Sequence, residues 1–109
     1  MKVFFCSTDL ARRCADEATS ERTYGRALAS VLHRRLGEMV AATHLAMLRR
    51  IPAARLRSDP AQEGGLLVAL GEGADLRVQL RSGLVPLLLD GSLDEQKVTE
   101  LLVTEVAVA

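Results

Sequence analysis

The heptapeptide DLRVQLR, residues 75–81, alternates polar and apolar side chains without a break. A period of two places the polar side chains on one face of a β-strand and the apolar side chains on the other. The heptapeptide therefore predicts a half-buried strand whose polar face carries the guanidinium groups of Arg77 and Arg81.

The segments on both sides of this strand predict further strands. Residues 66–70 form the uninterrupted apolar run that is typical of a central strand, and residues 97–108 are rich in β-formers. We predict two more strands over 2–6 and 54–58. Turns are predicted from Gly, Pro and Ser pairs at 59–60, 64–65, 71–73, 82–83 and 90–91.

Residues 84–89 are apolar and predict one further strand. Pro86 lacks a backbone donor, so we expect this strand at an edge of the sheet.

The first half of the chain predicts helices. Its clearest element runs from about Tyr24 to Ala42, where apolar side chains recur at helical spacing. They are Leu28, Val31, Leu32, Leu36, Met39 and Val40. A second helix is expected over 9–18, capped by Thr8 or Asp9, with a joint at 21–25.

A short helix over 44–50 is expected to follow, with Thr43 as its cap and Pro52 as its end. The order β-α-α-β-β-β-(β)-β predicts a single α+β domain over residues 1–109. We expect two to three N-terminal helices packed on a twisted, mostly antiparallel sheet.

Charge is distributed unevenly along this neutral chain. Residues 1–57 hold eleven Lys or Arg against five Asp or Glu, a net charge of +6, and residues 58–109 hold three against nine, a net charge of −6. A basic half indicates either a patch for an anionic partner, RNA or acidic protein, or an ordinary solvated helix surface.

Composition and spacing exclude several classes of protein. No apolar run approaches the ~20 residues of a membrane span, so we expect no membrane partner, and the absence of an export signal predicts a cytoplasmic protein with reduced Cys6 and Cys14. His33 and His44 lack the spacing of metal ligands, so neither a metal nor another cofactor is expected.

Arginine is the residue type that remains for chemistry. Arg55 and Arg57 alternate on one predicted strand, and Arg77 and Arg81 share a face of another, so a sheet brings such residues within reach of one another. Several guanidinium groups on one face can hold an RNA backbone and stabilise charge that develops on a phosphate. The alternative is that they are ordinary solvent-facing strand residues.

Several segments together resemble RelE/HigB-type toxins, the plasmid-maintenance killer proteins. In the helical half they are Tyr24-Gly25, LHRRLGE at 32–38 and LRRIPAAR at 48–55. Towards the C-terminus, Pro86, DGSLD at 90–94 and KVT at 97–99 are similar to the ending of one branch of that family.

This resemblance implies a RelE-like fold and the toxin component of a type II toxin–antitoxin system. Such a toxin is a ribosome-associated mRNA endoribonuclease, an mRNA interferase that inhibits translation. Its implied partners are a cognate antitoxin, mRNA and the ribosome. If active, it would cleave RNA without a metal, because the 2′-hydroxyl of the RNA attacks the adjacent phosphate while basic side chains neutralise the transition state.

The resemblance also implies site residues. Arg77 stands at the family's strand arginine and Arg57 at its histidine, so both are predicted as catalytic residues. The expected RNA-binding residues are Arg55, Arg81, Arg49 and Arg50. Asp59 stands where the family has lysine, Gln62 where it has arginine, and residues 106–109 lack its terminal histidine.

These departures leave a second hypothesis open. The chain would then be a catalytically inactive toxin-fold module that binds an antitoxin-like protein or RNA, with the predicted helices over 24–42 and 43–50 as its binding surface.

Overall fold

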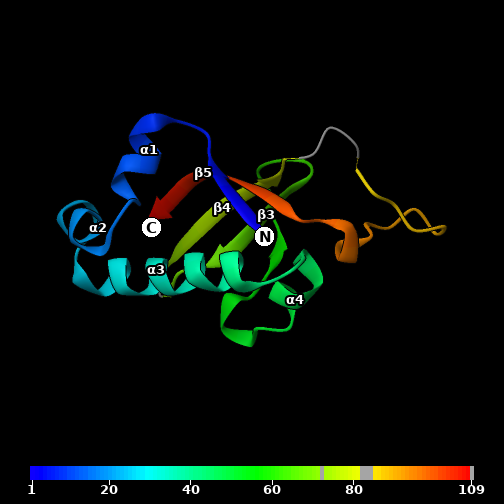
Figure 1. The fold of residues 1–109 in the computed structure, drawn as a ribbon, viewed down its shortest axis with the longest axis horizontal. Coiled ribbons are helices and arrows are strands. Elements are labelled where there is room, and N and C mark those ends of the chain that lie inside the picture. The colour runs from blue at the N-terminus through cyan, green and yellow to red at the C-terminus, as the bar shows by residue number, and fades with distance from the viewer. Residues whose placement is uncertain (72, 82–84, 109) are drawn as a thin grey trace.

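The computed structural model describes residues 1–71, 73–81 and 85–108, and arranges them as a layer of helices against one sheet (Figure 1). The α-helices are α1 (Thr8–Arg13), α2 (Glu17–Tyr24), α3 (Arg26–Ala41) and α4 (Leu45–Arg49). The strands are β1 (Lys2–Phe5), β2 (Arg57–Ser58), β3 (Gly65–Ala69), β4 (Ala74–Leu80) and β5 (Glu100–Val108). Two 3₁₀ turns complete the order, η1 (Pro52–Ala54) and η2 (Glu95–Lys97).

The five strands form one open sheet in the order β1-β5-β4-β3-β2. The pairs β2–β3, β3–β4 and β4–β5 are antiparallel, whereas β1 lies parallel to β5, with Lys2 opposite Glu100. The expected α+β class with a mostly antiparallel sheet is therefore confirmed.

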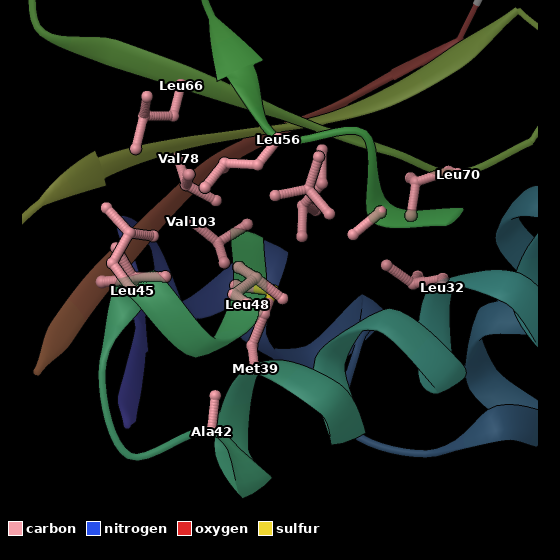
Figure 2. Close-up of a cluster of buried hydrophobic side chains, with 14 of the residues drawn as sticks. Leu32, Met39, Ala42, Leu45, Leu48, Leu56, Leu66, Leu70, Val78 and Val103 are labelled. Atoms are coloured by element: carbon pink, nitrogen blue, oxygen red, sulfur yellow. The ribbon is translucent and has the colours of Figure 1, made fainter. Parts of the chain in front are cut away.

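The core lies between the sheet and helices α3 and α4 (Figure 2). Leu32 and Met39 project from α3, and Leu45 and Leu48 from α4, and all four are fully buried. They meet the apolar side chains that alternate along the strands, which include Leu66, Val68, Leu76, Val78, Leu101 and Val103. The period-two pattern of 75–81 and the helical stripe of 24–42 thus form the two sides of a single core, except that Val40 of the stripe is exposed.

The predicted helix over 9–18 is wrong, because the chain forms two helices there. The side chain of Asp16 accepts a hydrogen bond from Thr19 N–H at 2.7 Å and so caps a new helix, α2, which also occupies the predicted joint at 21–25. The first half consequently has four helices instead of the expected two to three. The predicted cap at Thr43 is also wrong, since His44 is the N-cap residue of α4.

Two strand predictions also differ from the structure. Over 54–58, Pro52–Ala54 forms a 3₁₀ turn and Arg55 adopts a left-handed conformation with φ of 44°, so only Arg57–Ser58 pairs as a strand. Residues 85–89 contain no strand, only an isolated bridge between Leu87 and Leu93. Leu84, the predicted turn at 82–83 and the middle of the turn at 71–73 lie outside the described residues.

Candidate functional site

The face of the sheet opposite the core, here called the open face, carries the polar side chains of strand β4. Arg57, Leu67, Arg77 and Glu105 are aligned across β2, β3, β4 and β5 by the strand register. Two strand spacings separate the two arginines, about 10 Å between backbones. Leu67, between them, is only 8% exposed. The two predicted catalytic arginines are therefore brought onto one face.

Arg77 is held by carboxylates on both sides. Its Nη1 lies 3.2 Å from Oδ2 of Asp59, and its Nε lies 3.3 Å from Oε2 of Glu105 at an angle that makes no hydrogen bond. The Asp59 side chain is only 3% exposed. Such a partly buried, charge-assisted contact is stronger than a surface ion pair.

Asp59 is fixed in this position by the turn between β2 and β3. Its backbone N–H donates to the carbonyl of Gly65 at 2.9 Å, and its Oδ1 accepts a hydrogen bond from Ala61 N–H at 2.9 Å. Asp59, which stands at the position of the expected lysine, is therefore held in place on the open face by the turn.

Arg57 is also neutralised. Its Nη2 lies 2.6 Å from Oδ1 of Asp75, and its Nη1 donates to the carbonyl oxygen of Arg55 at 3.1 Å. Both predicted catalytic arginines thus contact acidic side chains of the same face.

The predicted RNA-binding residues are spread over the molecule. Arg81 stacks over the ring of Phe4 at 3.9 Å and lies 3.4 Å from Oε1 of Glu100. Arg49 makes a two-pronged contact with Glu95, with Nε and Nη2 each 2.7 Å from a carboxylate oxygen, and these hydrogen bonds raise the pKa of Arg49 above its ordinary value. Its role is to join α4 to η2.

Arg50 and Arg55 complete the predicted set. Arg50 is exposed at the C-cap of α4, and Arg55 is exposed beside the sheet edge. The structure therefore gathers Arg57 and Arg77, with Arg55 next to them, and places Arg49 and Arg50 on a different element.

The histidines and the tyrosine of the chain lie away from the open face. The chain has two histidines and one tyrosine. Tyr24 belongs to α2, His33 to α3, and His44 precedes α4. Nε2 of His33 lies 2.8 Å from the hydroxyl of Ser20, which is fully buried and donates to the carbonyl of Arg13. His33 thus links α2 to α3, and the open face has no histidine or tyrosine to act as a proton donor.

No family model, curated protein or solved structure matches the chain. Within the described ranges no group of three His, Cys, Asp or Glu could hold a metal ion. Among the same residues, no helix has the length and apolar character that crossing a membrane requires.

The sequence does not predict the carboxylates that neutralise the open face. Asp75 stands on the same polar face as Arg77 in the heptapeptide, but its pairing with Arg57 crosses from β4 to β2 and depends on strand order. Asp59 was visible only as a departure from the family pattern, with nothing to show that it turns towards Arg77. Strand order and turn geometry are tertiary features that no local pattern contains.

Proposed function

We propose that this chain is a RelE/HigB-type toxin-fold protein of a type II toxin–antitoxin system that acts by binding an antitoxin-like protein, without cleaving mRNA. The sequence resemblance over 24–55 and 86–99 supports the toxin-type assignment. An α+β fold with a helical layer on one sheet is compatible with it.

The main support for a binding role without cleavage is that carboxylates neutralise the arginines of the open face. Arg57 contacts Asp75, and Arg77 contacts Asp59 and Glu105. An RNA phosphate would have to displace carboxylates that belong to the same chain, and an intramolecular group competes at an effective concentration of roughly millimolar or more. Phosphate capture at Arg77 is therefore strongly disfavoured in this state.

Most of the cations that are available to a partner lie on the helical layer. Five exposed arginines there have no carboxylate oxygen within salt-bridge distance among the described residues, namely Arg12, Arg22, Arg26, Arg34 and Arg50. Arg26 and Arg34 are eight residues apart on α3, about two turns, and share its outward face. This surface fits an acidic segment of a partner protein.

A second candidate function is active mRNA cleavage at the ribosome. The alignment of Arg77 with Arg57 across the sheet favours it, because two guanidinium groups on one face can stabilise a phosphorane-like transition state. In that case ribosome binding would have to open the pairs with Asp59 and Asp75.

Controlled expression in a bacterium, with growth and mRNA ends followed together, separates the two candidates. We expect normal growth and intact messages. We also expect a complex with the product of an adjacent antitoxin-like gene, which R26E/R34E weakens and R57A/R77A leaves intact. Rapid arrest with new ends inside translated messages, abolished by Arg77→Ala, would instead establish the nuclease.

A further inference from the structure

A hairpin-like arm, residues 85–94, projects from the end of the molecule (Figure 1). It is an ordered element, because Asp94 N–H donates to the carbonyl of Pro86 at 2.8 Å and Leu88 N–H to that of Ser92 at 2.7 Å. The molecule measures 46 Å along its longest axis against 27 Å across. The arm lies at one end of that axis.

The arm carries most of the large apolar side chains that the described residues leave exposed. Leu89 is 110% exposed, Leu87 60%, Val85 56% and Leu88 49%. Together these side chains expose an apolar area of a few hundred Å² on the arm, by order of magnitude the size that marks an interaction site on a soluble protein.

A concave apolar surface lies at the base of the same arm. This groove has a volume of about 560 Å³. It is lined by Leu66 and Leu80 from the sheet and Val85 and Leu93 from the arm, and its polar rim includes Asp59 and Glu63. Leu87, Leu88 and Leu89 are not among its lining residues. The chain therefore presents an exposed apolar arm and a groove side by side, and the three leucines at the arm's tip do not enter that groove.

We propose that two copies of this chain form a symmetric dimer in which the arm of each copy occupies the groove of the other. Because arm and groove are adjacent, a two-fold axis between them lets both contacts form at once and closes the assembly.

The area and the charge of these surfaces agree with a second copy as the occupant. Two arms and two grooves together bury on the order of 1,200 Å², the lower bound for a specific interface. The chain has a net charge of zero, so two copies experience no overall repulsion. At the tip, Asp90 is exposed, and its Oδ1 accepts a hydrogen bond from Ser92 N–H at 2.9 Å.

Sedimentation equilibrium of the intact chain at increasing concentration tests this dimer. We expect reversible dimerisation with a dissociation constant of roughly micromolar order, as befits a small interface. Leu89→Asp should raise that constant at least ~100-fold, because the substitution occurs twice in a symmetric dimer. Val40→Asp is the matched control: Val40 is 60% exposed on α3, outside the arm, and its substitution should leave the constant unchanged.

A groove variant distinguishes arm exchange from simple contact between arms. Gln62 lines the groove and is exposed, so Gln62→Trp should fill it and abolish the dimer while leaving the arm intact. Mixing the Leu89→Asp and Gln62→Trp variants should restore one of the two contacts and yield a weak heterodimer. A monomer at every concentration, or a dimer that is indifferent to Leu89→Asp or to Gln62→Trp, overturns the proposal. Circular dichroism of each variant checks that the fold is retained.

Discussion

Arg35 takes its charge into the interior of the molecule. It is 6% exposed, and its guanidinium group donates to the carbonyls of Ala69 and Ala53 at 3.0 and 3.1 Å and to Glu38 at 3.0 Å. One side chain thus donates hydrogen bonds to the end of β3, to the 3₁₀ turn η1 and to a carboxylate on its own helix. A charge at this depth is tolerated because its donors are matched by acceptors on three sides.

Arg35→Ala should destabilise the fold by about 3 kcal/mol, because it removes the donor from the buried carbonyl of Ala69 and from the partly buried carbonyl of Ala53, and opens a cavity. Urea denaturation followed by circular dichroism measures the change in the free energy of unfolding. Arg34→Ala, one position along on the exposed side of α3, serves as the control and should change that free energy by no more than about 0.5 kcal/mol. Equal effects of the two substitutions would show that Arg35 does not join the layers.

At the residue scale, the sequence allowed the position of a side chain to be predicted more readily than its partner. The alternation of residues 75–81 correctly placed Arg77 on the polar face of a strand in the sheet. That Asp59 neutralises it depends on how the turn after β2 folds back, which is a contact between segments 18 residues apart. The buried role of Arg35 had a signal, since it lies three residues after Leu32 and four before Met39 on the buried stripe.

At the element scale, the chain breaks between α1 and α2 because the side chain of Asp16 binds a backbone N–H group that would otherwise belong to a continuous helix. Asp16 takes an extended conformation and its carboxylate accepts the N–H of Thr19, which starts a new helix where apolar spacing alone predicted continuation. The hydrogen bond from Thr19 N–H lowers the pKa of Asp16 below its ordinary value of 3.8. The cap therefore stabilises α2 only while the carboxylate is ionised.

Asp16→Ser should make the capping of α2 independent of pH, because serine caps a helix without titrating. A carboxylate with a lowered folded-state pKa contributes stability above its unfolded pKa, and loses it as the pH falls through the lower folded-state value. The difference in the free energy of unfolding between wild type and Asp16→Ser should thus be constant from pH 8 to about pH 5 and should shift in favour of the variant below about pH 4. Urea titrations at several pH values provide the measurement, and a difference that stays constant down to pH 3 would contradict the capping role.

Elements with a long, uninterrupted pattern were predicted best. The helix expected over 24–42 is α3 at Arg26–Ala41, and the strand expected over 75–81 is β4 at Ala74–Leu80. The failures lie where the pattern was short or purely apolar. Hydrophobicity alone predicts a strand over 84–89, but the described part of this segment extends into solvent and pairs only through one bridge, between Leu87 and Leu93.

At the scale of the whole molecule, the opposite charges of the two halves of the chain partly cancel in space. Arg49 of the basic half contacts Glu95 of the acidic half, and Arg57 contacts Asp75 in the same way. The acidic half also neutralises its own Arg77 and Arg81. The open face is therefore close to electrically balanced, whereas the outer surface of the helices remains basic.

Asp59→Asn/Asp75→Asn should convert the open face into an anion-binding surface, because it frees Arg57 and leaves Arg77 with Glu105 as its only carboxylate partner among the described residues. We expect the affinity for a short single-stranded RNA to rise by roughly tenfold or more and to fall steeply with salt, as phosphate contacts do. Fluorescence anisotropy at several salt concentrations measures both effects. Glu17→Gln/Glu21→Gln on α2 removes the same two negative charges away from the open face, so an equal gain from this control would mean that net charge alone is responsible.

The class and layering of the molecule could be predicted from sequence, but its strand order could not. Periodicity shows that the helices and strands have one apolar face each, which is enough to predict a helical layer on a sheet. The placement of β5 between β1 and β4 is a choice among long-range pairings, and no short segment of the chain encodes it.

The parallel pairing of β1 with β5 has a consequence for the order in which the fold is assembled. The residues that pair, such as Lys2 and Glu100, are separated by nearly the whole chain, so this contact closes the largest loop in the molecule. During synthesis β1 is made before the other strands and its partner β5 after them. Until then the apolar side chains of Val3 and Phe5 have no neighbouring strand, and the sheet is completed only when the last strand arrives between the first strand and the β2–β3–β4 meander.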